Sequence, residues 1–118
     1  MRNVKSEDII SEIEKMCADV NYNLPCDVAE CVASLVKNDK SIQDNILLEI
    51  LQNAQVAAKE HIALCQDTGT ANFFVKIGKN VNITGDDITS SINKGVERGY
   101  RKYFLRKSIV FDPIDRKN

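Results

Sequence analysis

The chain has 118 residues, 43% hydrophobic and 28% charged, a composition typical of one folded domain and unlike disordered or membrane-embedded chains. Its 16 basic and 17 acidic residues give a formal charge of -1, which argues against nucleic acid or an anionic membrane surface as a partner. An acidic N-terminus without an export signal, and no apolar run of membrane-spanning length, predict a cytoplasmic protein. Its four cysteines are then expected to be thiols, metal ligands or core residues rather than disulfides.

The first half of the chain has the apolar spacing of helices. Apolar side chains recur at three- and four-residue steps over residues 7 to 20, and Ser6 is placed to cap this helix. Pro25 suits the opening of a second helix, which we expect to end near Lys37-Asn38. Ser41 is placed to cap a third and longer helix, which we expect to extend to about residues 59–61.

The second half combines a strand pattern with a further helix. Residues 73 to 77 alternate in the period-two manner of a strand, and Gly78-Lys79-Asn80 turns the chain toward residues 81–83, which predicts a short hairpin. Thr84 and Asp87 are spaced as a capping pair before a helix over about 86–104. We therefore predict an α+β fold, predominantly helical, with about four helices and a short β-hairpin, in a single domain over residues 1–118.

The densest chemical signal is the run Cys65-Gln66-Asp67-Thr68-Gly69-Thr70, which precedes the predicted hairpin. It brings a thiol, an amide, a carboxylate and two hydroxyls into six residues, with a glycine that can adopt a positive φ. Composition alone is compatible with a structural turn, in which Asp67 and Thr68 bond the nearby backbone, and with a functional loop. The two interpretations stay open at this level.

The string CQDTGT resembles the signature of the class I, iron-sulfur-dependent fumarases and the related L-tartrate dehydratases. The resemblance extends to the opening Leu24-Pro25-Cys26-Asp27-Val28, the alanine-rich helix before the motif, Phe73-Phe74-Val75, and Gly99-Tyr100 through Leu105-Arg106. The chain is similar to the N-terminal part of the family's alpha subunit. Ala63 departs from the proline common at that point, and family alpha regions continue past the position of Asn118, so we expect this chain to be a fragment.

The resemblance implies a [4Fe-4S] cluster held by three cysteines, with one iron open to act on the substrate as a Lewis acid. Cys65 matches the first of these ligands. The resemblance implies that the other two family ligands lie beyond the end of this sequence, and Cys17, Cys26 and Cys31 match neither of them. A complete cage of three thiolates is therefore not expected within these 118 residues.

The same resemblance implies roles for three further residues in a lyase reaction, the reversible hydration of a small dicarboxylate such as fumarate in the tricarboxylic acid cycle, or the dehydration of tartrate. Gln66 and Asp67 match residues that contact the dicarboxylate, and Asp67 is the candidate for proton transfer. Arg106 matches an arginine that binds a substrate carboxylate, although a lone arginine there is also compatible with an exposed helix-end cation.

The family comparison also implies how such a chain works. The fragment alone is expected to be inactive. Its expected partners are the remainder of the alpha region and a beta subunit or C-terminal half, in a homodimer or higher assembly. Fumarate and tartrate enzymes share the motif, so the substrate is left open between them.

Two other functions are compatible with the residues. His61 precedes Cys65 by four positions, and with Cys26 and Cys31 it could form a small zinc module, although the spacings match no standard one. The apolar run Ile109-Val110-Phe111 is compatible with a non-catalytic helical interaction domain, in which the CQDTGT turn is structural.

Overall fold

The computed structural model describes residues 2–37 and 41–115. It is predominantly helical with a short two-stranded sheet, which confirms the α+β class. The chain divides into two compact units. Unit 1 comprises Met1–Ala18 and Gln66–Asn118, and unit 2 comprises Asp19–Cys65. The single domain over residues 1–118 remains a prediction.

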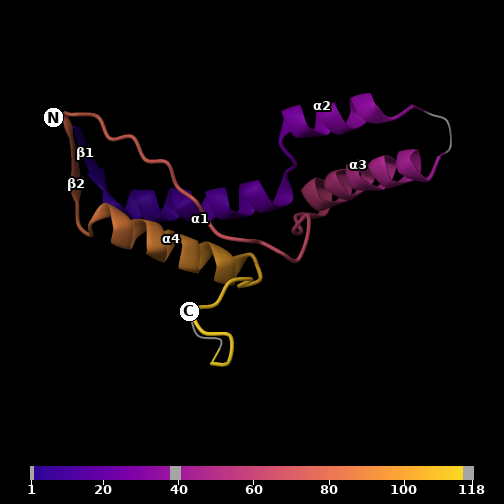
Figure 1. The fold of residues 1–118 in the computed structure, drawn as a ribbon. Helices are drawn as coiled ribbons and strands as arrows, with labels where there is room; N and C mark the ends of the chain where they lie inside the picture. Colours follow the sequence, from indigo (N-terminus) through magenta and orange to yellow (C-terminus); the bar gives the residue numbers. More distant parts are fainter. Residues whose placement is uncertain (1, 38–40, 116–118) are drawn as a thin grey trace. The chain divides into compact units, whose positions relative to one another are not determined.

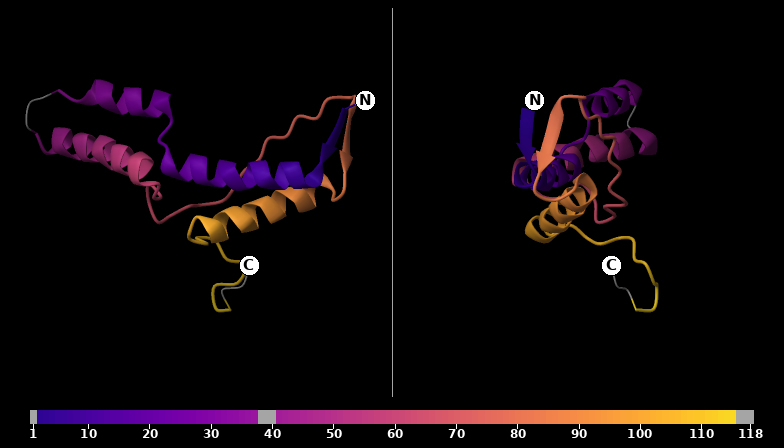
Figure 2. Two further views of the ribbon diagram at one scale, coloured as in Figure 1. Left: turned by 180° about the vertical axis from the view of Figure 1, so that it is seen from behind. Right: turned by 90° about the vertical axis from the view of Figure 1, so that its left-hand side faces the viewer.

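Unit 1 is built on two helices that lie side by side, α1 (Ser6–Tyr22) and α4 (Ile88–Lys102) (Figures 1 and 2). The last turn of α1 extends into unit 2. Both helices overlap their predicted ranges, with ends shifted by two residues or fewer. Asp87 is the N-cap of α4, as its carboxylate accepts a hydrogen bond from the backbone N–H of Ser90 at 3.0 Å. Thr84, the other member of the predicted capping pair, lies in a strand instead.

The face of α4 that packs on α1 consists of small residues. Ser91, Gly95 and Gly99 recur every four residues and are all buried. A Cβ atom added at Gly95 would lie 2.7 Å from Ile13 Cβ, and one added at Gly99 would lie 2.7 Å from Cys17 Cβ. The two helix backbones therefore approach closer than any larger side chain on α4 would allow.

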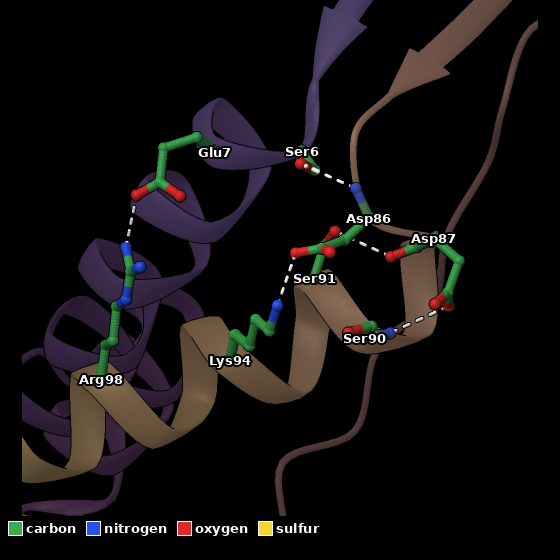
Figure 3. Close-up of polar contacts among 8 residues, drawn as sticks. All are labelled: Ser6, Glu7, Asp86, Asp87, Ser90, Ser91, Lys94 and Arg98. Atoms are coloured by element: carbon green, nitrogen blue, oxygen red, sulfur yellow. Dashed lines mark hydrogen bonds and ion pairs between the residues drawn. The ribbon is translucent and has the colours of Figure 1, made fainter.

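Polar contacts tie the same two helices together along their exposed edge (Figure 3). Arg98 on α4 pairs with Glu7 on α1 at 2.5 Å. Lys94 pairs at 2.6 Å with Asp86, in the turn before α4, and so links that turn to α4 itself. Ser6 was predicted to cap α1, but it is the first residue of that helix, and its hydroxyl accepts a hydrogen bond from the N–H of Asp86 at 3.1 Å. The serine thus joins the start of α1 to the turn before α4.

The strands correct the predicted hairpin. β1 (Arg2–Lys5) and β2 (Val81–Thr84) pair in parallel, with Arg2 opposite Val81 and Lys5 opposite Thr84. β2 therefore pairs with the N-terminus of the chain. Residues 73–77, the expected first strand of the hairpin, belong to no strand.

The hairpin prediction was wrong because the sequence carries no local strand signal at β1. Three of the four residues of β1 are polar, so this segment has no period-two apolar pattern, and its partner follows almost eighty residues later. The expected turn does form, because the N–H of Val81 donates to the carbonyl of Gly78 at 3.0 Å. Residues 73–77 instead line an apolar pocket of about 390 Å³ in unit 1, together with side chains of α1, the sheet and the start of α4.

Unit 2 contains α2 (Cys26–Leu35), which packs against α3 (Ile42–Glu60). Ser41 caps α3 as predicted, accepting from the N–H of Asp44 at 3.1 Å. α2 ends at Leu35, before the predicted end at Lys37-Asn38, and Asn38 itself lies outside the described residues. No residue of α2 is fully buried. Among the helices described, none has the length and apolar character needed to cross a bilayer.

Candidate functional site

The CQDTGT run lies in the connection between α3 and β2, outside regular secondary structure. Gln66 and Asp67 are exposed, whereas Thr68 is half-buried. Gly69 has a φ of +58°, and its N–H donates to Asp67 Oδ1 at 3.4 Å, a local turn that needs a residue tolerant of the left-handed region. The loop therefore presents an amide and a carboxylate side by side to solvent.

Cys65 is the last residue of unit 2 and is exposed. The approach to it is fixed through both backbone groups of Leu64. The N–H of Leu64 donates to the carbonyl of Asn21 at 2.8 Å, and its carbonyl accepts from Asn53 Nδ2 at 2.9 Å. These hydrogen bonds restrain the entry to the loop directly after Ala63.

Thr68 connects the loop to the segment that follows α4. Its N–H donates to Ser108 Oγ at 3.1 Å, and its hydroxyl donates to the backbone carbonyl of Arg106. Its own carbonyl accepts from the hydroxyl of Tyr100 at 3.4 Å. All three polar groups of Thr68 therefore bind residues of 100–108, and Arg106 is brought next to the loop.

A sharp reversal at the end of α4 makes this meeting possible. Tyr103 donates its N–H to the carbonyl of Gly99, and Leu105 donates its N–H to the carbonyl of Tyr100, both at 3.0 Å. Between them Phe104 has a φ of +55°, so the pattern is the left-handed helix end that usually contains glycine. Leu105 is buried, and the chain leaves it toward the CQDTGT loop.

A pocket of about 510 Å³ opens beside this contact, within unit 1. Its walls are the loop after Thr68, one face of α4 and the segment after Arg106: Gly69, Thr70, Ala71, Asn93, Val96, Glu97, Tyr100, Arg101, Lys107, Ser108 and Ile109. Gln66, Asp67 and Arg106 are not in this lining. The predicted site residues thus stand on exposed surface next to the pocket, each just before a segment that forms one of its walls.

The thiols test whether this chain fits an iron-sulfur cluster. Cys17 is buried, and burial, followed by the charge of Glu14, raises the pKa of its thiol, so it is a poor thiolate donor. Cys26 and Cys31 lie on the exposed surface of α2. Over residues 2–37 and 41–115, no three cysteine, histidine or acidic side chains gather as metal ligands. The described residues therefore offer Cys65 as a single donor and do not fit a cluster by themselves.

The same finding weakens the zinc hypothesis. His61, Cys65, Cys26 and Cys31 are all described, and they form no ligand group. His61 is the left-handed C-cap of α3, and its ring meets the ring of Tyr22 edge-on, with centroids 6.2 Å apart. The contact indicates a packing role for this histidine.

Comparison with known protein families shows to which family the chain belongs. The family model described as "Fumarate hydratase (Fumerase)" matches residues 10–118. The chain belongs to this fumarate hydratase family. The match includes the CQDTGT loop and the segment that contains Arg106.

Individual relatives of this fumarate hydratase family member have two kinds of name. A protein of Methanocaldococcus jannaschii with the provisional name L(+)-tartrate dehydratase subunit alpha is 33% identical over 98% of this chain and 40% of its own length. Fumarate hydratase class I, anaerobic, of Escherichia coli is 34% identical over 65% of this chain and 14% of its own length. L(+)-tartrate dehydratase subunit alpha of Escherichia coli is 28% identical over 87% and 35%. The chain thus spans less than half the length of these relatives.

The structure adds residues that the sequence did not single out. Tyr100 and Ser108 had no expected role near the loop, yet both bind Thr68. For Thr68 itself, the structural-turn interpretation suggested a hydrogen bond to the nearby backbone. No sequence signal joins positions that lie 32 to 40 residues apart.

Proposed function

We propose that this chain is part of a hydro-lyase that adds water to, or removes it from, a small dicarboxylate. Fumarate and malate are the first candidates and tartrate is the second, because relatives with both kinds of name match the chain. One observation supports the proposal most strongly. In a member of the fumarate hydratase family, the CQDTGT loop is hydrogen-bonded to the segment that contains Arg106.

The side chains on these two segments suit the proposed chemistry. The guanidinium of Arg106 is a planar fork of donors that matches a substrate carboxylate. The amide of Gln66 can donate to a carboxylate or a hydroxyl of the substrate. The carboxylate of Asp67 is the candidate for moving the proton during addition or loss of water. All three are exposed, so a substrate can reach them in this chain.

The proposal includes an iron-sulfur cluster that this chain holds through one ligand. Cys65 directly precedes the amide and the carboxylate, and its thiolate would contribute that ligand. The described residues offer no further set of donors, so the other two thiolates would come from the rest of the protein. The greater length of the relatives agrees with this division. The 118 residues alone would therefore be inactive.

Exposed apolar side chains support contacts with the rest of the protein. After α4, Phe111 is 98% and Ile114 89% exposed, and Ile109 is more than half exposed. Large apolar groups exposed together are typical of surfaces that bind another protein segment. We propose that the remainder of the alpha region covers them, and that a beta subunit or C-terminal half and a second copy complete a cytoplasmic enzyme.

The test is a hydration assay on the complete protein, assembled under anaerobic conditions with its iron. Wild type should convert fumarate or tartrate, and Asp67→Asn should lower kcat by about 10²- to 10⁴-fold, the usual contribution of a general acid or base. Asp8→Asn, which changes an exposed carboxylate on α1, is the matched control and should keep the wild-type rate. A wild-type protein with iron but no activity on either dicarboxylate would contradict the proposal.

A further inference from the structure

We infer that Thr68 is a positioning residue, which holds the Gln66-Asp67 segment at a fixed spacing from Arg106 so that both can bind one dicarboxylate. The inference rests on the proposed function. It goes beyond it in assigning a task to a side chain that needs no contact with substrate. Its basis is the set of hydrogen bonds that Thr68 makes to residues 100–108.

The hydrogen bonds act on the peptide units next to the proposed binding side chains. The N–H of Thr68 belongs to the planar peptide unit that begins at the carbonyl of Asp67, so its bond to Ser108 fixes the orientation of that unit. The hydroxyl of Thr68 binds the carbonyl of Arg106 itself. The two restrained groups, the peptide unit after Asp67 and the carbonyl of Arg106, therefore lie within one residue, about 3.8 Å along the chain, of a proposed binding side chain.

Burial singles out the same residue. Gln66, Asp67, Gly69 and Thr70 are all exposed, and Thr68 alone in this stretch is half-buried. The loop is therefore anchored at one point, with the proposed binding side chains directly before it. Threonine is suited to this task, since its β-branch restricts χ1 and keeps the hydroxyl in a fixed direction.

The other end of the contact is also restrained. Leu105 is buried and donates to the carbonyl of Tyr100 at the end of α4, so the backbone of Arg106 starts from a fixed point. Tyr100 additionally binds the carbonyl of Thr68. α4 thus sets the position of Arg106 and of the loop at once. A two-point ligand such as a dicarboxylate needs this kind of constant spacing between the groups that bind its ends.

The experiment compares Thr68→Val, Thr68→Ser and Ser108→Ala in the complete iron-loaded enzyme. Valine keeps the shape of threonine and removes the hydroxyl, whereas serine keeps the hydroxyl. Thr89→Val, at an exposed threonine near the start of α4, is the matched control. Hydrogen exchange is measured on peptides covering residues 66–71 and 105–110. The dissociation constant of succinate, an unreactive dicarboxylate, is measured together with KM, kcat and iron content.

In Thr68→Val we expect faster exchange in both peptides, unchanged iron content, and succinate binding weakened about tenfold, since one hydrogen bond no longer holds the spacing. We expect kcat to fall by about 10²-fold, the usual effect of misplacing groups by about 1 Å. Thr68→Ser should restore both values, and Ser108→Ala should show the same direction as valine.

Two results would overturn the inference. One is unchanged exchange, or unchanged succinate binding, in Thr68→Val when the wild-type enzyme is active. The other is equal impairment by valine and serine, which would assign the effect to packing. Failure of the proposed function has a separate signature, because the wild-type protein itself would then neither bind succinate nor convert fumarate or tartrate.

Discussion

Replacing Gly95 by alanine should destabilise the chain, although alanine is the better helix former. The added Cβ would lie 2.7 Å from both Cβ and Cγ2 of Ile13 and 3.0 Å from the carbonyl oxygen of Ile10. Ordinary carbon contacts are about 3.5–4.0 Å, so α1 and α4 would have to separate by about 1 Å. None of these atoms is the far end of a flexible side chain, and a rotamer change alone cannot relieve the overlap.

The magnitude follows from two opposing effects. Overpacking of this kind costs about 1–3 kcal/mol, and removing a glycine from a helix returns up to about 1 kcal/mol. We expect the free energy of unfolding to fall by about 1–2 kcal/mol. Gly78→Ala is the matched control, since its Cβ would meet only Val81 Cγ2, at 3.7 Å, and stability should change by about 0.5 kcal/mol or less.

The assay is urea unfolding of the 118-residue chain, followed by helical circular dichroism. The midpoint should fall in Gly95→Ala, with an unchanged dependence on urea. A Gly95→Ala chain as stable as wild type would refute the close packing of α1 on α4. Equal losses in Gly95→Ala and Gly78→Ala would refute the explanation by overlap.

Two further predictions test single residues of unit 1. Phe104 has a φ of +55° and is 93% exposed, so Phe104→Gly should relieve a backbone strain of about 1–2 kcal/mol. The entropy cost of glycine offsets part of this gain, and thermal stability should rise slightly. A clear loss of stability would show that the ring packs against the chain in solution. Burial first, and the charge of Glu14 second, raise the pKa of the Cys17 thiol, so this thiol should react with thiol reagents more slowly than Cys26 and Cys31. The pKa of the Cys17 thiol is higher in the folded chain than in the unfolded chain, so the free energy of unfolding should decline as pH rises past the ordinary thiol pKa. Cys17→Ala should remove that decline. Labelling of Cys17 as fast as that of Cys26 would contradict the burial of Cys17.

The sequence predicts the helices well because their signals are local. Ser41 marks the start of α3 through a side-chain cap that the structure confirms, and Asp87 does the same for α4. The strand partner could not be predicted in this way. β1 is short and mostly polar, so the sequence does not mark it as a strand. Only the folded chain shows that β2 pairs with β1 and not with residues 73–77.

The candidate site, too, could be predicted from the sequence only in part. The CQDTGT string and Arg106 are visible in the sequence through their resemblance to a family, and the family itself is confirmed. The contacts that join them are not visible. They depend on the chain reversal at Phe104, and phenylalanine in a sequence does not predict a left-handed backbone conformation. They also depend on the hydroxyls of Thr68 and Ser108, which the sequence does not distinguish from other hydroxyls in the chain.

The iron content of the complete protein after Cys65→Ser tests most directly whether Cys65 is a cluster ligand, with Cys31→Ser as the control at another exposed thiol. Both variants are assembled anaerobically, and bound iron and labile sulfide are measured per chain alongside the cluster's spectroscopic signal. We predict a full cluster in wild type and Cys31→Ser, and loss of most of the iron and of the hydro-lyase activity in Cys65→Ser. A Cys65→Ser protein with wild-type iron and rate would contradict it.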